Sequence, residues 1–254
     1  MPFTDATKAV DDRLIVSVWG ETKRGKTAFS LSFPEPIFYL DFDLQISELL
    51  RVRTELLKKA IQRAQYFVPE NPTVEEAAII LAGFLDDYQD ACEIAAKDNG
   101  TVVVDTATIL NTLVQKVKVG ERVEKRLKVL AQKEKDKKAI DPDLVKVFPY
   151  DYSDANALMR ALLRRPKLYP TLNAVFIHRA REKWAENGAP TGIYEFHGFN
   201  ETADIVEATI QMKKNRAGQI VGVIGPNRFN QDMEGMEVPN LDYETVKDMF
   251  LGSD

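Results

Sequence analysis

The segment from Gly20 to Thr27 combines glycine, lysine and threonine at the spacing of a phosphate-binding loop. It reads Gly-Glu-Thr-Lys-Arg-Gly-Lys-Thr and fits the pattern G-x-x-x-x-G-K-[ST]. In loops of this kind, successive backbone N–H groups and the N-terminus of the next helix face the phosphates of a nucleotide. Lys26 would then contact the β- and γ-phosphates, and the hydroxyl of Thr27 would bind Mg²⁺. The residues expected to bind the nucleotide are Gly20, Glu21, Thr22, Lys23, Arg24, Gly25, Lys26, Thr27 and Ala28.

Lys23 and Arg24 are unusual in the middle of such a loop, where small residues are common. The apolar run Leu14–Trp19 predicts a buried parallel strand before the loop, and Lys26–Phe33 predicts a helix that ends before Pro34. This order of strand, loop and helix favours a nucleotide site over an ordinary turn with a basic tip. We expect the two basic side chains to point outward, toward solvent, a neighbouring subunit or the γ-phosphate.

Acidic residues end two further predicted strands. Asp105 closes the run Thr101–Thr106 (TVVVDT) and is a candidate to hold the metal together with Thr27. Asp41 and Asp43 close the run PIFYLDFD, at the sheet edge where α/β folds bind ligands, and either carboxylate could orient or activate a water molecule. The alternatives are a turn or helix-cap role for Asp105 and a helix N-cap role for Asp43.

The elements that must position these residues follow from the spacing of apolar side chains. Thr73-Val-Glu-Glu76 predicts a capping box at the start of a helix that runs to about Lys97. Further expected segments are a mostly helical stretch at 44–65, strands at 173–178, 204–213 and 219–224, and a short helix at 242–250. The alternation of strands and helices predicts an α/β fold with a mainly parallel central sheet, helices on both faces and a C-terminal antiparallel hairpin.

The bulk composition excludes several classes of protein. With 254 residues and 44% hydrophobic content, the chain can form one large α/β domain or a core domain with an insertion. A net charge of −5 means that any DNA contact must come from a local basic patch. The single cysteine, Cys92, excludes a disulfide framework. The acidic start of the chain and the lack of a long apolar run predict a cytoplasmic protein with no membrane partner.

A basic stretch, Lys116–Lys138, is the first candidate for a nucleic-acid surface. It lies in a basic helical insertion expected at about 111–150 within a single domain over 1–254. It holds ten Lys or Arg against four acidic residues, a local net charge of +6 that suits contacts with phosphates. A solvated charged helix face explains the pattern equally well.

The second candidate is a flexible loop expected at about 179–199. Its cations are interleaved with Trp184, Tyr194 and Phe196, a composition that suits the binding of single-stranded bases. The alternative is a hairpin whose aromatic side chains pack onto the core.

Taken together, these segments resemble the RecA-like ATPase core over roughly residues 13–230. LIVSVWGETKRGKT resembles its first strand and phosphate loop, FYLDFD the strand whose last carboxylate activates water, and VVVDTATIL the metal-binding strand. NAVFIHRARE resembles the strand whose polar end senses the γ-phosphate, and IVEATIQMKKNRAGQIVGVIGPNRFN resembles the C-terminal hairpin. The resemblance implies a RecA-like P-loop NTPase core that binds ATP and Mg²⁺. The catalytic residues that it implies are Lys26, Asp43, Asp105, His178 and Arg228, with Thr27 and Asp105 on the metal.

The chain departs from this family at two of these positions. Asp43 stands where the family has Glu, which shortens the reach to water. The family's K-N-K-like segment, which contacts the ATP of a neighbouring subunit, reads Pro226-Asn227-Arg228 here, so Arg228 is the remaining trans-acting candidate. The compact length resembles the small phage-encoded RecA-like ATPases, including the Sak-type single-strand annealing proteins. This resemblance implies single-stranded DNA as a partner, a homo-oligomer (ring or filament) and a place in the host cytoplasm.

Three functions fit these patterns. The first is an ATPase that acts on single-stranded DNA in phage-type recombination or annealing, with turnover at subunit interfaces. The second is a nucleotide-dependent switch or assembly protein with little turnover and no DNA role. The third is a small-molecule kinase, which the missing lid arginines disfavour.

Overall fold

The central sheet contains nine strands, which the computed structural model defines within residues 13–133, 146–185 and 188–252. Their order is β3-β2-β4-β5-β1-β7-β8-β9, and β6 pairs with β5 off this path. The strands from β3 to β7 are parallel, whereas the pairs β5–β6, β7–β8 and β8–β9 are antiparallel. Their bounds are β1 (Ile15–Gly20), β2 (Ile37–Asp41), β3 (Ile61–Gln65), β4 (Thr101–Asp105), β5 (Asn173–Trp184), β6 (Pro190–His197), β7 (Ala208–Lys214), β8 (Ile220–Asn227) and β9 (Glu237–Pro239).

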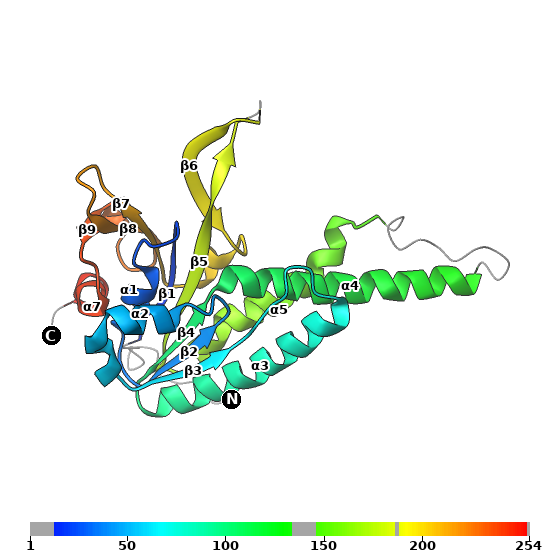
Figure 1. Cartoon of the computed structure of the whole chain (residues 1–254), viewed down its shortest axis with the longest axis horizontal. Coiled ribbons are helices and arrows are strands. Elements are labelled where there is room, and N and C mark those ends of the chain that lie inside the picture. The colour runs from blue at the N-terminus through cyan, green and yellow to red at the C-terminus, as the bar shows by residue number, and fades with distance from the viewer. Residues whose placement is uncertain (1–12, 134–145, 186–187, 253–254) are drawn as a thin grey trace, which may run out of the picture.

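Helices cover both faces of this sheet, as the alternation of strands and helices predicts (Figure 1). The α-helices are α1 (Lys26–Ser30), α2 (Ile46–Val52), α3 (Val74–Lys97), α4 (Ala107–Lys133), α5 (Ser153–Arg164), α6 (Thr202–Ile205) and α7 (Tyr243–Leu251). The 3₁₀ turns are η2 (Thr54–Lys58), η4 (Pro149–Tyr152), η5 (Arg165–Leu168) and η6 (Gln231–Met233). Helices α3, α4 and α5 pack on one face, and α1, α2 and α7 pack on the other. The far half of α4 extends beyond the body of the molecule (Figure 1).

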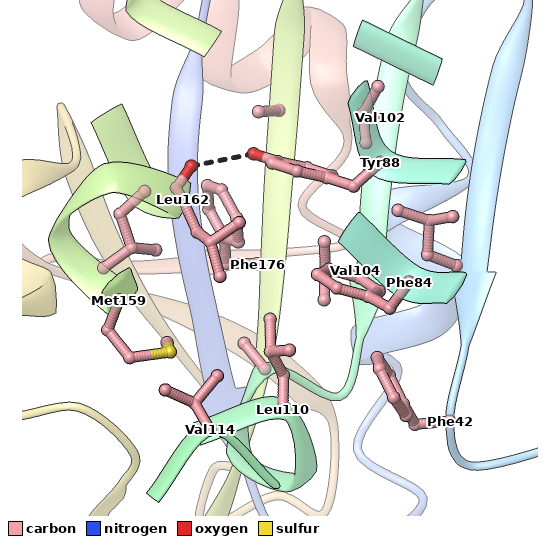
Figure 2. Packing of buried hydrophobic residues seen from close by; sticks show 14 of the residues in the cluster. Phe42, Phe84, Tyr88, Val102, Val104, Leu110, Val114, Met159, Leu162 and Phe176 are labelled. Atoms are coloured by element: carbon pink, nitrogen blue, oxygen red, sulfur yellow. Dashed lines mark hydrogen bonds between the residues drawn. The ribbon is translucent and has the colours of Figure 1, made fainter. Parts of the chain in front are cut away.

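Strand alternation divides the core into two clusters. On β4, Val102 and Val104 face α3–α5, whereas Val103 faces α1 and α7. Figure 2 shows the first cluster, in which Tyr88 of α3 donates a hydrogen bond of 2.9 Å to the carbonyl of Leu162 in α5. Both faces of the inner parallel strands β1, β2, β4 and the first half of β5 are therefore buried, which explains why these segments are continuous apolar runs in the sequence.

The capping box predicted at Thr73 is confirmed. The Thr73 hydroxyl accepts from the Glu76 backbone N–H at 3.1 Å, and the Glu76 carboxylate accepts from the Thr73 N–H at 2.8 Å. Two otherwise unpaired N–H groups are thus satisfied at the start of α3.

The expectation of a mostly helical stretch at 44–65 is only partly met. Helix α2 and the turn η2 occupy its first part, but Ile61–Gln65 forms the edge strand β3. Gln62, Arg63 and Gln65 are exposed on this strand, so it lacks the apolar run that marks the inner strands. The pairing with β2, which defines β3, is a long-range contact without a local signature.

The segment expected as a flexible loop at 179–199 is a β-hairpin. Strand β5 continues to Trp184 and pairs with β6, and Arg181 donates a hydrogen bond of 2.8 Å to Glu195 across the two strands. Of the basic helical insertion expected at 111–150, residues 111–133 belong to α4, which begins earlier, at Ala107, and Pro149 and Tyr150 belong to η4. Positions 134–145 lie outside the described residues.

Candidate nucleotide site

The phosphate loop connects the end of β1 to the first residue of α1. Gly25 forms the N-cap of α1 in the left-handed region, with φ of 83°, and Lys23 also has a positive φ of 61°. Gly20 has φ of 149°, and a Cβ at this position would collide with the backbone carbonyl of Met212 in β7. The two pattern glycines therefore occupy positions that a larger residue would strain.

Lys26 folds back over the loop. Its Nζ donates to the carbonyls of Gly20 at 2.8 Å and Glu21 at 2.7 Å. Burial lowers the pKa of Lys26, and the nearby carboxylates of Asp105 and Asp43 oppose this shift. The ammonium group thus lies between the loop backbone and the acidic residues, in the place where the sequence pattern predicts contact with phosphates.

Thr27 and Asp105 meet at the base of the loop. The Thr27 hydroxyl lies 3.2 Å from Asp105 Oδ2, and the hydroxyl of Tyr39 in β2 also donates to that oxygen. Burial raises the pKa of Asp105 to about 6, and the hydrogen bond from Tyr39 opposes this rise.

Mg²⁺ fits this pair of oxygen ligands. It is typically held by one or two protein oxygens together with phosphate oxygens and water. Within the described residues, no group of three or more His, Cys, Asp or Glu side chains is arranged to hold a metal without a nucleotide. Thr27 and Asp105 are therefore the residues that would hold Mg²⁺ beside bound phosphates.

Asp43 lies at the same edge of the sheet, just beyond the end of β2. Its carboxylate accepts a hydrogen bond from the guanidinium of Arg179 in β5, in an ion pair that passes above the end of β4. Asp41, the other candidate acid, is buried, and its Oδ1 accepts from the Leu44 N–H at 2.7 Å. Asp41 therefore stabilises the turn after β2, and Asp43 is the acid that faces the loop.

These side chains surround a cavity of about 470 Å³. The loop lines one side of it, and Asp43, Asp105 and Arg179 line another. In the loop, Arg24 forms an ion pair of 3.2 Å with Glu21, whereas Lys23 is exposed. Lys23 thus points outward as expected, but Arg24 is held against its own loop.

The expectation that His178 faces the nucleotide is wrong. Val175 and Ile177 of β5 pack in the cluster that includes α1, so His178 points to the opposite face of the sheet. It is fully buried beside Phe196, and a Cβ on Gly198 would collide with its ring. Burial lowers the pKa of His178 to about 3, and neither ring nitrogen has a hydrogen-bond partner among the described residues.

Arg228 lies at the opposite edge of the sheet from the phosphate loop. Its backbone N–H donates to the carbonyl of Glu207, which precedes β7, and its guanidinium donates to the carbonyl of Asp204. Arg228 therefore lies away from the phosphate loop of its own chain. The basic turn at 213–216 lies instead at the loop edge, because β7 runs parallel to β1 and ends there.

The basic face of α4 is partly used for internal contacts. Arg122 donates to Asp154 at 2.8 Å, and Arg126 pairs with the buried carboxylate of Asp151. These contacts tie α4 to η4 and to the start of α5, and Phe148 and Tyr150 stack on each other beside Arg126. Two of the cations predicted as nucleic-acid contacts therefore have structural partners.

The β5–β6 hairpin combines both of the alternatives expected for it. Phe196 packs inward against His178 and Trp19. Trp184 and Tyr194 are 63% and 38% exposed, near the cations of β5. The hairpin projects from the body at the same edge as the phosphate loop (Figure 1).

Tyr39 and Arg179 are site residues that the sequence patterns did not assign to the nucleotide site. Both depend on strand order, because β2 and β5 flank β4 in the sheet and bring their side chains to Asp105 and Asp43. If the strand order had been known, the alternation of side chains along β2 and β5 would have placed Tyr39 and Arg179 on the face of the sheet that carries the phosphate loop.

No protein-family model matches the chain, and no curated protein matches it in sequence. Among solved structures, a prototypical ATPase of the type III secretion system of pathogenic bacteria superimposes with a TM-score of 0.50 at 10% identity. The match covers 80% of this chain and 52% of that one, so this chain spans about half the length of the secretion ATPase. The fold is that of the RecA-like ATPases. The RadB recombinase matches with a TM-score of 0.45 at 12% identity, over 90% of this chain and 86% of its own.

The RecA-like sheet places the loop, Asp105 and Asp43 at or just beyond the carboxyl ends of β1, β4 and β2, at the edge where folds of this class bind ligands. None of the helices in the described part of the chain is long and apolar enough to cross a membrane.

Proposed function

We propose that this protein binds ATP with Mg²⁺ and hydrolyses it. The observation that supports this most directly is the convergence of Lys26, Thr27, Asp43 and Asp105 on one cavity behind a glycine loop. In this proposal, loop N–H groups and Lys26 bind the phosphates and stabilise charge that develops on the γ-phosphoryl oxygens. Thr27 and Asp105 would hold Mg²⁺, which would supply positive charge beside the phosphate oxygens.

Asp43 is the residue that we assign to the attacking water. The water oxygen forms a bond to the γ-phosphorus while the bond from that phosphorus to the bridging oxygen of ADP breaks. Asp43 accepts the proton that the water loses and passes it on to the released phosphate. This role requires the Asp43 carboxylate to be free of Arg179 at the moment of attack.

Single-stranded DNA is the proposed partner, in a homo-oligomer of the phage-type recombination or annealing class. The support is the sequence resemblance to the Sak-type proteins, together with the exposed Trp184 and Tyr194 on a projecting hairpin. We assign Arg228 to the ATP of a neighbouring copy, because it lies far from its own loop.

The test is the rate of phosphate release measured without nucleic acid and with single-stranded DNA, duplex DNA or RNA. We expect the highest rate with single-stranded DNA, and an affinity for DNA that falls steeply as salt rises. Equal rates in all four conditions would contradict the DNA role, and the absence of phosphate release would contradict the ATPase.

A second function is favoured by one observation. The pairing of Asp43 with Arg179 occupies the carboxylate that hydrolysis needs, which suits a nucleotide-dependent switch or assembly protein with little turnover. This function predicts oligomers that form on addition of ATP, little phosphate release and no response to DNA. Sedimentation with ATP and with ADP, beside the rate measurement, separates the two functions.

A further inference from the structure

A second cavity, of about 670 Å³, adjoins the nucleotide cavity. It lies between the loop that joins β3 to α3, the first half of α4 and the base of the β5–β6 hairpin. Phe42, Ile109 and Leu113 give it an apolar part, and Lys116 and Arg179 give it two cations. Its volume lies in the range of cavities that hold small organic ligands.

The two cavities share the Asp43–Arg179 ion pair. Asp43, Gln45 and Arg179 line both of them. The side chains of Arg179 and Asp43 are 48% and 21% exposed, so the guanidinium is the more accessible partner. A ligand in the second cavity can therefore compete for Arg179 without entering the nucleotide cavity.

Two cations, Lys116 and Arg179, and two carboxylates, Asp43 and Glu70, line the second cavity, so an anionic group would bind at the cations. Lys116 is exposed and forms no ion pair with any described residue, and Arg179 forms one only with Asp43. A guanidinium binds phosphate oxygens in a two-pronged geometry, which makes a phosphodiester a strong competitor for a single carboxylate. The apolar wall offers a surface for the attached base.

We propose that the second cavity binds one nucleotide unit of single-stranded DNA, and that its phosphate draws Arg179 away from Asp43. The proposal rests on the proposed ATPase function and extends it by a contact that couples the two sites. Without DNA, the Arg179 guanidinium donates to Asp43 Oδ1, one of the two oxygens that could accept the proton of the attacking water. With DNA bound, that oxygen becomes free.

The first test compares Arg179→Gln with the unchanged protein. The glutamine has no charge to hold Asp43, so the rate without DNA should rise toward the rate that the unchanged protein reaches with saturating oligothymidylate. The response of the variant to DNA should be weak. Because Arg179 is about half exposed, we expect the variant to fold, and thermal unfolding checks this.

The second test measures DNA binding independently of turnover. Lys116→Glu should weaken the binding of fluorescent oligothymidylate, measured by anisotropy, and lower the slope of log affinity against log salt by about one. The matched control is Lys97→Glu, the same charge change on an exposed residue at the far end of α3. The control should leave both quantities unchanged.

The outcomes separate this proposal from the proposed function. If the unchanged protein responds to DNA but Arg179→Gln is equally slow or slower without it, the ATPase function stands and the coupling contact is wrong. If Arg179→Gln is faster but Lys116→Glu binds DNA normally, the ion pair restrains turnover and the DNA site is wrong. If neither protein releases phosphate, both proposals fail.

Discussion

The hydroxyl of Thr27 lies 3.2 Å from Asp105 although 78 positions separate the two residues in the chain. Their strands are not neighbours, because β5 lies between β1 and β4. The loop therefore has to carry the start of α1 across β5 to reach the end of β4. This contact joins the two residues that are proposed to hold Mg²⁺.

Lys26→Ala should lower nucleotide affinity or turnover by roughly 100-fold, since it removes the cation beside the phosphates. The loss of two hydrogen bonds to loop carbonyls should change stability little, because water can replace them at this half-buried position. The measurement is the binding of a fluorescent ATP analogue together with phosphate release. Lys97→Ala, at an exposed lysine at the end of α3 and away from the loop, is the control and should behave like the unchanged protein.

Asp105→Asn should abolish Mg²⁺-dependent nucleotide binding and stabilise the fold. Burial raises the pKa of Asp105 to about 6, so the folded protein holds an unfavourable buried charge at neutral pH. Removal of this charge should raise the free energy of unfolding by up to about 3 kcal/mol. Urea denaturation at neutral pH measures this change. A less stable variant that still binds nucleotide with Mg²⁺ would show that Asp105 has a structural role only.

His178→Leu should retain turnover and reduce the sensitivity of the fold to acid. Burial lowers the pKa of His178 to about 3, whereas in the unfolded chain the ring takes up a proton near 6.5. The unfolded state therefore binds more protons as pH falls from 6.5 toward 3, and the fold loses stability over that range. The variant lacks this contribution, so its free energy of unfolding should fall less steeply there. A large loss of turnover at neutral pH would restore a catalytic role for His178.

Trp184→Ala should weaken single-stranded DNA binding by about 1–3 kcal/mol, the usual contribution of one stacked base. The side chain is 63% exposed, so the melting temperature should stay nearly constant. Leu168→Ala, at a residue that is 75% exposed just before β5, is the matched control. Equal affinities of the two variants would exclude the hairpin as the site of base stacking.

Arg228→Ala should lower turnover only in the oligomer, because each copy is proposed to supply Arg228 to the ATP of a neighbouring copy. When it is mixed with Lys26→Ala, turnover should partly recover, because some interfaces pair an intact loop with an intact Arg228. Arg216→Ala is the comparison, since Arg216 lies in the turn at the loop edge. Recovery with Arg216→Ala alone would move the trans role to this turn.

The strand–loop–helix order around Gly20–Thr27 and the place of Asp105 at the end of β4 could be predicted from sequence because both have local signatures. A glycine loop after an apolar run, and an acid after four β-prone residues, are visible without knowledge of strand order. Tyr39 and Arg179 have no such signature, since their roles depend on β2 and β5 lying on either side of β4. The edge strand β3 was missed for the related reason that only its pairing defines it.

The error at His178 has a specific physical origin. The strand was expected to end at this residue, with a polar end at the nucleotide. Strand β5 instead continues to Trp184, and alternation along it sends His178 to one face and Arg179 to the other. His178, which was expected at the site, is therefore a buried ring on the other face of the sheet. The next residue, Arg179, is the cation that lies at the site.

Gly20 has a consequence for how this loop can vary in evolution. A side chain at position 20 would strike the Met212 carbonyl and displace β7, together with the basic turn that β7 supports. Lys23, by contrast, faces solvent in a left-handed conformation that many loops fill with glycine. Selection should therefore tolerate substitutions at position 23 and keep glycine at position 20. A library of variants at both positions, scored by survival, would show this difference.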